Sequence, residues 1–189
     1  EKTGEINLED TIVEEDMVVF ITHHNYAKRN ALSLYRAQKR RGQGVMGIIP
    51  KEGDFLEHLF VASTHDIILI FTDKGQVYKL KVYQLPQAGR SAKGSSLKNL
   101  LALSSDENVA AILPIRKFEE DLYILMGTRK GIIKKSRLTD YQNIRTNGIR
   151  AIVIDDDDHL ISVRITNGHQ DIFLATHNGY SIRFRSEEH

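Results

Sequence analysis

The sequence contains no cysteine and no tryptophan, and only three of its 189 residues are proline. Without cysteine the chain can form neither a disulfide nor a thiolate metal site, which fits a reducing cytoplasm. No apolar run reaches the roughly 18 residues that a membrane-spanning helix needs, so we expect no membrane segment. Residues 1–16 are acidic and have no apolar core, and they contain no recognisable secretory signal. We therefore expect a cytoplasmic protein.

Signatures of catalysis are missing as well. The sequence has no Gly-Lys-Ser/Thr phosphate loop and no dinucleotide fingerprint. The acidic run Asp155–His159, "DDDDH", lacks the ligand spacing and the turn glycine of a calcium loop, which favours a solvated acidic turn over a metal site. The run Ser63–Asp66, "STHD", holds sequence neighbours, whereas a nucleophilic triad assembles from separated elements, so a hydrogen-bonded turn is favoured. We predict no catalytic residue, no metal and no cofactor in this chain.

Acidic residues are absent from two long windows and nearly absent from a third. Residues 17–50 and 74–105 each contain six Lys or Arg and no acid, and residues 129–154 contain seven against the single acid Asp140. The rest of the chain is strongly acidic, so the net charge of +1 hides an alternation of basic and acidic blocks. If the basic blocks share a surface, that surface is strongly positive.

The chain repeats a short pattern four times. The pattern recurs at residues 18–29, 69–79, 124–135 and 173–183. It consists of an apolar run followed by Thr, two residues of any type, Gly or Asn, three further residues and finally Lys or Arg. Gly and Asn tolerate the positive φ that a tight turn requires, so each copy predicts a β-hairpin.

The repeat predicts an all-β fold. After each hairpin come a basic, turn-rich corner and two apolar segments, which gives about four strands in roughly 50 residues, the period of a propeller blade. No long stretch has helical periodicity, so helices should be few. We expect a propeller-like array of three complete blades and the start of a fourth, with residues 1–189 forming a fragment of one domain.

The basic corners indicate a polyanion as the ligand. The segments "KRRGQG" (39–44), "RSAKG" (90–94) and "RTNG" (145–148) occupy equivalent positions, so in a radial array they lie along one curved rim. Such a track suits duplex DNA, because phosphate contacts supply affinity without sequence preference and a curved rim can bend the duplex. A propeller that docks proteins through its central face is the alternative, although it has no need of basic corners in each repeat.

Long ordered strings also resemble a known family. "GEINLEDTIVEEDMVVFITHHNYAKR", "DFLEHLFVASTHDIILIFTDKGQVYKLKVYQLPQAGRSAKG" and "DLYILMGTRKGIIKKSRLTDYQNIRTNGIRAI" are similar to successive blades of the C-terminal DNA-wrapping domain of bacterial DNA gyrase A, and more loosely to that of topoisomerase IV. The resemblance covers the whole chain. It implies a β-pinwheel, a propeller-like array in which neighbouring blades exchange strands, with duplex DNA wrapped around its perimeter.

The family's wrapping signature, the gyrase A box, reads Gln-basic-basic-Gly-Gly-basic-Gly. Arg41 here replaces a glycine and Gln43 replaces a basic residue, while the number of positive charges stays at three. The matching residues are Gln38, Lys39, Arg40, Arg41, Gly42, Gln43 and Gly44. We expect further DNA contacts from the rim, at Lys28, Arg29, Arg36, Lys79, Lys81, Arg90, Lys93, Lys134, Lys135, Arg137, Arg145 and Arg150.

The resemblance also implies partners. In the family, gyrase A with its N-terminal region and gyrase B form a heterotetramer that acts on duplex DNA and introduces negative supercoils, using ATP and magnesium bound outside this module. The resemblance thus implies a nucleoid-associated module that binds and bends DNA without cutting it. A topoisomerase IV module that binds DNA without strong wrapping is the alternative within the family.

Overall fold

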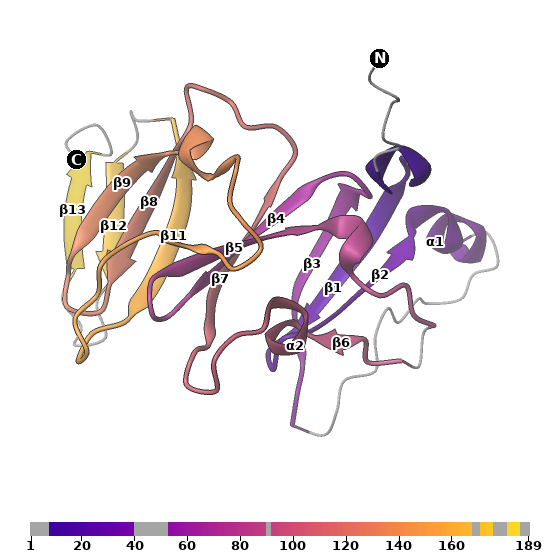
Figure 1. Cartoon of the computed structure of the whole chain (residues 1–189), viewed down its shortest axis with the longest axis horizontal. Helices are drawn as coiled ribbons and strands as arrows, with labels where there is room; N and C mark the ends of the chain where they lie inside the picture. Colours follow the sequence, from indigo (N-terminus) through magenta and orange to yellow (C-terminus); the bar gives the residue numbers. More distant parts are fainter. Residues whose placement is uncertain (1–7, 40–52, 90–91, 168–170, 176–180, 186–189) are drawn as a thin grey trace, which may run out of the picture. The chain divides into compact units, whose positions relative to one another are not determined.

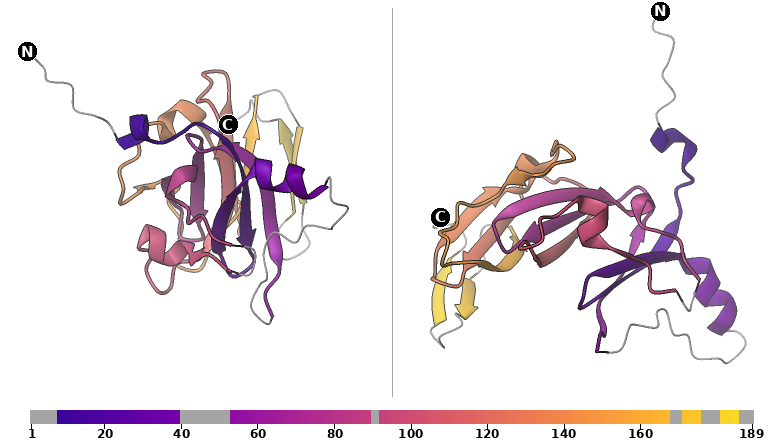
Figure 2. Two further views of the ribbon diagram at one scale, coloured as in Figure 1. Left: turned by 90° about the vertical axis from the view of Figure 1, so that its right-hand side faces the viewer. Right: turned by 60° about the horizontal axis from the view of Figure 1, so that its bottom comes forward.

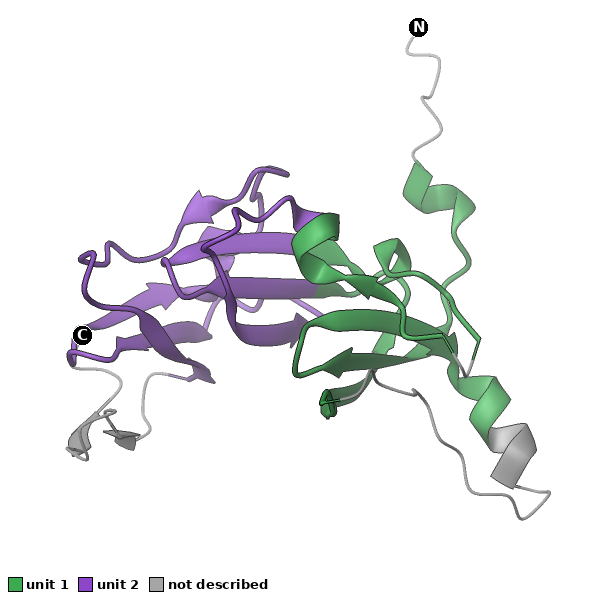
Figure 3. Cartoon of the chain, turned by 90° about the horizontal axis from the view of Figure 1, so that it is seen from below, with its two compact units in different colours: residues 1–67, 80–100 green, residues 68–79, 101–189 purple. Residues whose placement is uncertain are grey.

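The computed structural model describes residues 8–39, 53–89, 92–167, 171–175 and 181–185. The chain forms two compact units (Figure 3). Unit 1 comprises residues 1–67 and 80–100, and unit 2 comprises residues 68–79 and 101–189.

Unit 1 is built on a four-stranded antiparallel sheet in the order β3-β1-β2-β6. The elements lie in the unit's chain order as follows (Figure 1): η1 (Leu8–Thr11), β1 (Asp16–Thr22), β2 (Tyr26–Ala31), α1 (Leu32–Lys39), β3 (Leu56–Ser63), η2 (Val82–Gln84), β6 (Ser95–Ser96) and α2 (Leu97–Leu101, whose last residue belongs to unit 2).

Strand β1 forms the centre of this sheet and is buried from Met17 to Thr22. Successive side chains of a strand point to opposite faces, so a strand that is buried throughout must be covered on both faces. On one face Val18 and Phe20 pack against Leu32 and Tyr35 of α1, which lies next to β1 and β2 (Figures 1 and 2).

Unit 2 contains the remaining strands in three sheets. Their orders are β10-β5-β4-β7, β11-β8-β9 and β12-β13. The elements are β4 (Ile67–Thr72), β5 (Gln76–Lys81), β7 (Val109–Ile115), β8 (Tyr123–Thr128), β9 (Ile133–Arg137), η3 (Leu138–Tyr141), β10 (Ile149–Arg150), β11 (Leu160–Thr166), β12 (Asp171–Ala175) and β13 (Ser181–Arg185). Ile67 at the start of β4 and Leu80 and Lys81 at the end of β5 are assigned to unit 1.

Two sheets are completed by a strand from the next repeat. Strand β6 follows the second hairpin in sequence, yet it pairs with β2 of the first sheet. Strand β10 follows the third hairpin and pairs with β5 of the second. This exchange confirms the predicted all-β, pinwheel-like class and gives the first two sheets their four strands.

The hairpin pattern is confirmed in the three turns that the structure describes. Asn25, Gly75 and Gly131 have φ values of 67°, 85° and 91°. Their backbone N–H groups donate to the carbonyl oxygens of Thr22, Thr72 and Thr128 at 2.8, 3.0 and 3.0 Å. The fourth predicted hairpin is present as the antiparallel pair β12-β13.

One apolar segment is a helix where the sequence analysis expected a strand. The residues after the second corner, "LKNLLAL", form α2 over Leu97–Leu101. Leu and Lys are good helix formers, and Leu97 and Leu101 lie one turn apart and are both buried. The stretch before the first corner was not predicted as helical either, yet Leu32–Lys39 form α1.

Candidate nucleic-acid interface

One continuous segment of unit 2 carries five basic residues. Residues 133–150, which we call the exchange segment, run from edge strand β9 of one sheet through η3 to edge strand β10 of another (Figure 1). Only one acid, Asp140, lies in the segment. The predicted rim residues within it are Lys134, Lys135, Arg137, Arg145 and Arg150.

The backbone of the exchange segment is fixed at several points. Ile149 of β10 pairs with Val77 of β5. Tyr141 of η3 is buried, with its ring 6.0 Å from that of Phe71. The side chain of Lys134 donates to the carbonyl oxygen of Ala151 at 2.8 Å. The segment is therefore an anchored scaffold for its cations.

Glycines at the corners have a structural role that the sequence analysis did not foresee. Gly148, just before β10, has a φ of 74°, and a Cβ there would lie 2.8 Å from the carbonyl oxygen of Val77. Gly94, just before β6, has a φ of 84°, and a Cβ there would collide with the carbonyl oxygen of Ala27. Each corner therefore needs glycine so that the exchanged strand can approach the preceding sheet.

Three arginines of the exchange segment are available for a ligand. Arg137, Arg145 and Arg150 are exposed, and their side chains have no hydrogen-bond or ion-pair partner among the residues that the structure describes. The Nζ atom of Lys135 lies 4.7 Å from the centre of the Tyr123 ring. We call Arg137, Arg145 and Arg150 the free arginines.

Other predicted rim residues are tied to the protein itself. Lys28 has no exposed surface, and its Nζ donates to the carbonyl oxygen of Gly89 at 2.9 Å, so this predicted rim residue is bound to the protein's own main chain. Burial lowers its pKa. Arg29 donates to the carbonyl oxygens of Leu85 and Tyr83 at 2.9 and 3.4 Å. Burial also lowers the pKa of Arg29.

In the first two hairpin patterns, the basic residue that ends the pattern contacts the next repeat. Arg29 on β2 bonds the chain just after η2, and Lys79 on β5 donates to the carbonyl oxygen of Gln142, just after η3, at 3.1 Å. A cation satisfies a main-chain oxygen of the following repeat in both cases. A structural role can therefore explain why the pattern repeats a Lys or Arg at this position, independently of any ligand.

The remaining predicted positions divide into two groups. In unit 1, Lys81 forms an ion pair with Glu9 at 2.9 Å, and Lys93 lies over the Tyr26 ring at 4.9 Å. For the other positions the side chain is not described. The backbone of Arg36, Gln38 and Lys39 belongs to α1. The remaining predicted residues lie outside the described ranges altogether: Arg40, Arg41, Gly42, Gln43, Gly44 and Arg90.

A buried acid supports the hairpin turn in each of three repeats, and the sequence analysis missed it. Glu107 accepts a hydrogen bond from the Thr72 hydroxyl at 2.8 Å. Asp54 and Asp158 occupy the equivalent positions and accept hydrogen bonds from the backbone N–H groups of His24 and Lys130 in their turns, at 2.9 and 3.0 Å. The signal was present, because each acid stands two residues before a long strand, at β3, β7 and β11.

The carboxylates of Asp54 and Asp158 are held in their charged form. Burial alone would raise the pKa of Asp158, but hydrogen bonds from Thr128 and from the backbone N–H groups of Lys130 and His159 lower it below its usual value. The pKa of Asp54 is lowered against burial by Thr22 and by the N–H groups of His24 and Phe55.

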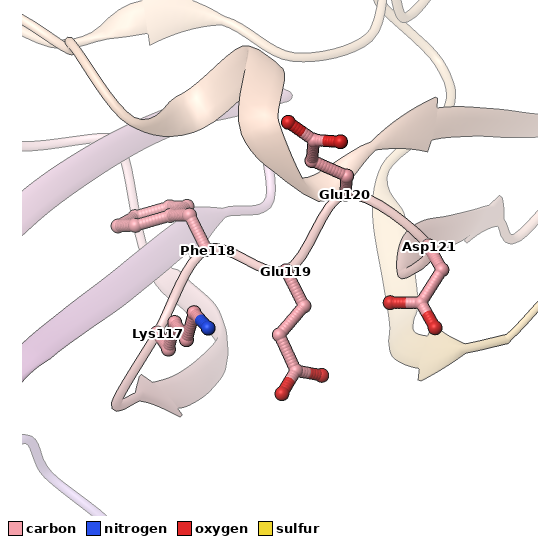
Figure 4. A pocket seen from close by; sticks show the side chains of 5 residues that line it. All are labelled: Lys117, Phe118, Glu119, Glu120 and Asp121. Carbon is pink, nitrogen blue, oxygen red and sulfur yellow. The ribbon is translucent and has the colours of Figure 1, made fainter.

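Carboxylates accompany the cations at the hairpin turns of unit 2 and in the loop between β7 and β8. At the hairpin turns Lys74 lies 3.8 Å from Asp106, and Lys130 forms an ion pair with Asp157. The loop between β7 and β8 forms a pocket lined by Lys117–Asp121, where Glu120 points away from Glu119 and Asp121 (Figure 4). These carboxylates would repel phosphate.

The two motifs that suggested other chemistry are turns. Ser63 and Asp66 exchange hydrogen bonds, from the Asp66 N–H to the Ser63 carbonyl at 3.0 Å and from the Ser63 N–H to the Asp66 carboxylate at 2.9 Å. In the acidic run, the N–H of Asp158 donates to the carbonyl oxygen of Asp155 at 3.0 Å. Within the described ranges no cluster of His, Asp and Glu is arranged to hold a metal ion, and no helix could span a bilayer.

Comparison with known families agrees with the fourfold repeat. The model of the DNA gyrase C-terminal domain, beta-propeller, matches residues 16–63, 66–116, 122–167 and 170–188, one match for each repeat. The chain belongs to the DNA gyrase C-terminal domain family. This membership confirms the resemblance inferred from the sequence.

Individual relatives give the same result. The chain is 48% identical to the DNA gyrase A protein of Clostridium acetobutylicum and 47% identical to that of Haemophilus influenzae, with 96% of this chain covered in both. It spans 22% and 21% of those two proteins, about a fifth of their length.

Solved structures share the fold. The C-terminal domain of DNA topoisomerase IV superposes with a TM-score of 0.81 at 32% identity, over 94% of this chain and 54% of that one. A DNA gyrase A C-terminal domain superposes with a TM-score of 0.62 at 21% identity, over 92% of this chain and 56% of that one.

Proposed function

We propose that this chain binds duplex DNA without sequence preference through the exchange segment and its equivalents in the other repeats. One observation carries the proposal: five cations and a single acid share a segment that runs between two sheet edges, and three of its arginines are exposed without a described partner. Phosphate contacts from Arg and Lys supply affinity through counterion release, whatever the sequence.

The form of the site favours a duplex over a single strand. Single-strand sites stack bases on rows of exposed aromatic rings, whereas Tyr78 and Tyr141 of this region are buried. Base readout would need a helix or strand that enters a groove, and the exchange segment offers edge strands with short, anchored turns. The site is suited to contacts with the phosphate backbone.

Family membership extends the proposal to a larger enzyme. We assign the chain to the C-terminal module of a gyrase-type topoisomerase, where it would wrap DNA so that strand passage introduces negative supercoils. Cleavage, and the ATP and magnesium that strand passage needs, would belong to the rest of gyrase A and to gyrase B in a cytoplasmic, nucleoid-associated heterotetramer. This chain would supply DNA binding alone.

A topoisomerase IV-type module is the second candidate. The superposition on the topoisomerase IV domain, with a TM-score of 0.81, favours it, as do Arg41 and Gln43 at two positions of the wrapping signature. Such a module would hold DNA without strong wrapping. The two candidates share the phosphate contacts and differ in the topology that they impose.

A ligation assay separates the candidates. The 189-residue chain is added in increasing amounts to nicked plasmid, the nick is sealed, the protein is removed and the linking number is measured, with binding followed by gel retardation. A gyrase-type module is expected to shift the linking number in the positive sense. Binding without a shift supports the topoisomerase IV type, and absence of binding at low salt would overturn both.

A further inference from the structure

A buried carboxylate joins strands β4 and β5, and the exchanged strand β10 pairs with β5. Glu107 is 4% exposed and stands just before β7. Its Oε2 atom accepts a hydrogen bond from the Thr72 hydroxyl at 2.8 Å, and its Oε1 atom accepts one from the Tyr78 hydroxyl at 3.3 Å. Because Thr72 ends β4 and Tyr78 lies on β5, the carboxylate joins both strands of the hairpin.

One of these contacts leads to the residue that precedes β10. The backbone of Gly148 lies against the Tyr78 ring so closely that a Cβ at Gly148 would be 2.9 Å from the ring carbon Cδ1. The ring therefore forms the surface on which the corner before β10 rests. The hydrogen bond to Glu107 holds the far end of that ring.

The other contact leads to the residues that follow β10. The carbonyl oxygen of Thr72 accepts a hydrogen bond from the N–H of Gly75 at 3.0 Å. The carbonyl oxygen of Gly75 in turn accepts bonds from the N–H groups of Ala151 and Ile152 at 2.7 and 3.2 Å. Glu107 thus supports both ends of a strand that has only two residues, Ile149 and Arg150.

We infer that Glu107 is a positioning residue for the DNA interface, fixing Arg145 and Arg150 through the hairpin turn and the Tyr78 ring. The inference rests on the proposed function, because it assigns these two arginines to phosphate contacts. Arg150 lies on β10, and Arg145 begins the turn that Gly148 closes with an N–H to carbonyl bond of 2.9 Å. A two-residue strand pairs too little to hold Arg150 and the preceding turn unaided.

Asp158 offers a matched control. It supports the turn of the third hairpin by accepting a hydrogen bond from the N–H of Lys130 at 3.0 Å, and it is similarly buried, at 7%. Among the described residues no strand is exchanged onto β9, so the loss of Asp158 leaves both ends of β10 in place. A variant at Asp158 therefore removes a buried carboxylate that supports a hairpin turn, and it should leave Arg145 and Arg150 in place.

The experiment is a double-mutant cycle on the 189-residue chain with a fluorescent duplex of random sequence. Glu107→Ala is measured in the unchanged background and together with Arg145→Ala and Arg150→Ala, and Asp158→Ala is measured in the same two backgrounds. We expect Glu107→Ala to weaken binding about tenfold alone and less than twofold when both arginines are absent. Asp158→Ala should have the same small effect in both backgrounds.

Amide hydrogen exchange gives a readout that does not depend on DNA. In Glu107→Ala the N–H groups of Ala151 and Ile152 should exchange at least about tenfold faster, and in Asp158→Ala they should not change. If Glu107→Ala does not fold, Glu107→Gln, which keeps an acceptor for Thr72, replaces it throughout and should show a smaller effect of the same pattern.

The outcomes separate the inference from the proposed function. Equal losses of affinity in both backgrounds, or unchanged exchange at Ala151 and Ile152, would overturn the role of Glu107 while DNA binding stands. An unchanged chain that fails to bind the duplex at low salt would overturn the proposed function and, with it, the phosphate contacts assigned here. Faster exchange at both amides would then support only the anchoring of β10.

Discussion

The basic residues of strand β2 and those of the exchange segment are the same residue types, yet they make different contacts. Lys28 and Arg29 donate to carbonyl oxygens at Gly89 and Leu85, whereas the free arginines are exposed and have no described partner. Both groups come from windows that are similarly rich in Lys and Arg. A count of charges therefore locates a basic window in the sequence. Hydrogen bonds to main-chain carbonyl oxygens decide which of its cations are left exposed to contact a ligand.

The largest expected effect comes from removing the free arginines together. Arg137→Ala, Arg145→Ala and Arg150→Ala should lower duplex affinity on the order of 100-fold near 0.1 M salt, because about one counterion is released for each phosphate contact. Fluorescence anisotropy with a labelled duplex measures the affinity, and circular dichroism checks that the strands persist. A loss below about threefold would mean that the free arginines do not contact phosphate.

A corner glycine tests whether the scaffold of the exchange segment needs the geometry described. Gly148→Ala should lower the free energy of unfolding by about 3 kcal/mol, since it combines a positive φ with a close approach to the backbone of Val77. Gly89→Ala is the control, because a Cβ there meets nothing within 4 Å and no positive φ is required. Equal denaturation midpoints for both variants would contradict the account.

Removing a tied cation should affect stability and leave DNA binding nearly unchanged. Arg29→Ala is expected to cost about 2 kcal/mol of unfolding free energy, because carbonyl oxygens at Leu85 and Tyr83 lose a charged donor. Urea denaturation measures the loss, and the duplex affinity is compared without urea at a temperature where the variant is folded. If Arg29→Ala lowered duplex affinity as much as removal of the free arginines does and left stability unchanged, Arg29 would be a DNA contact and not a structural one.

The smallest expected effect is on the pH dependence of stability. The pKa of Asp158 is lowered in the folded chain, so its contribution to stability is fully present above the unfolded value of about 3.9 and is lost as pH falls through the folded pKa. In that window the unfolded chain binds one more proton than the folded chain. Asp158→Asn should therefore flatten the fall in stability below about pH 4.

Denaturation midpoints of the two proteins between about pH 2.5 and about pH 5, a range that brackets the ordinary carboxyl pKa, measure this difference. Glu120→Gln is the control, because Glu120 is exposed and lies on the loop between β7 and β8, away from the hairpin turns. Parallel profiles for the unchanged chain and Asp158→Asn would contradict a lowered pKa of Asp158 in the folded chain.

Much of the fold could be predicted because the repeat carries turn chemistry. Thr72 and Gly75 have a fixed spacing that recurs in each repeat, and a positive φ at the Gly or Asn position leaves few alternatives to a hairpin. Strand exchange was implied by the resemblance alone, because pairing between β10 and β5 depends on distant residues that no local pattern encodes.

The candidate site was only partly predictable for the same reason. The windows around Arg137, Arg145 and Arg150 were identified, but nothing local distinguishes these arginines from Lys28, whose burial depends on a carbonyl 61 residues away. The role of Glu107 was not predicted because the residue lies in an acidic turn, and the acids of such a turn are normally exposed to solvent. The periodic placement of Asp54, Glu107 and Asp158 was the available signal.

The salt dependence of duplex binding tests the central claim most directly. The logarithm of the affinity is measured against the logarithm of salt concentration for the unchanged chain, for the variant without the three free arginines, and for the paired substitutions Lys28→Met and Arg29→Met. The account predicts that the slope becomes shallower by about 3 in the first variant and stays the same in the second, because a slope counts phosphate contacts. An unchanged slope without the free arginines, or a shallower one without Lys28 and Arg29, would contradict it.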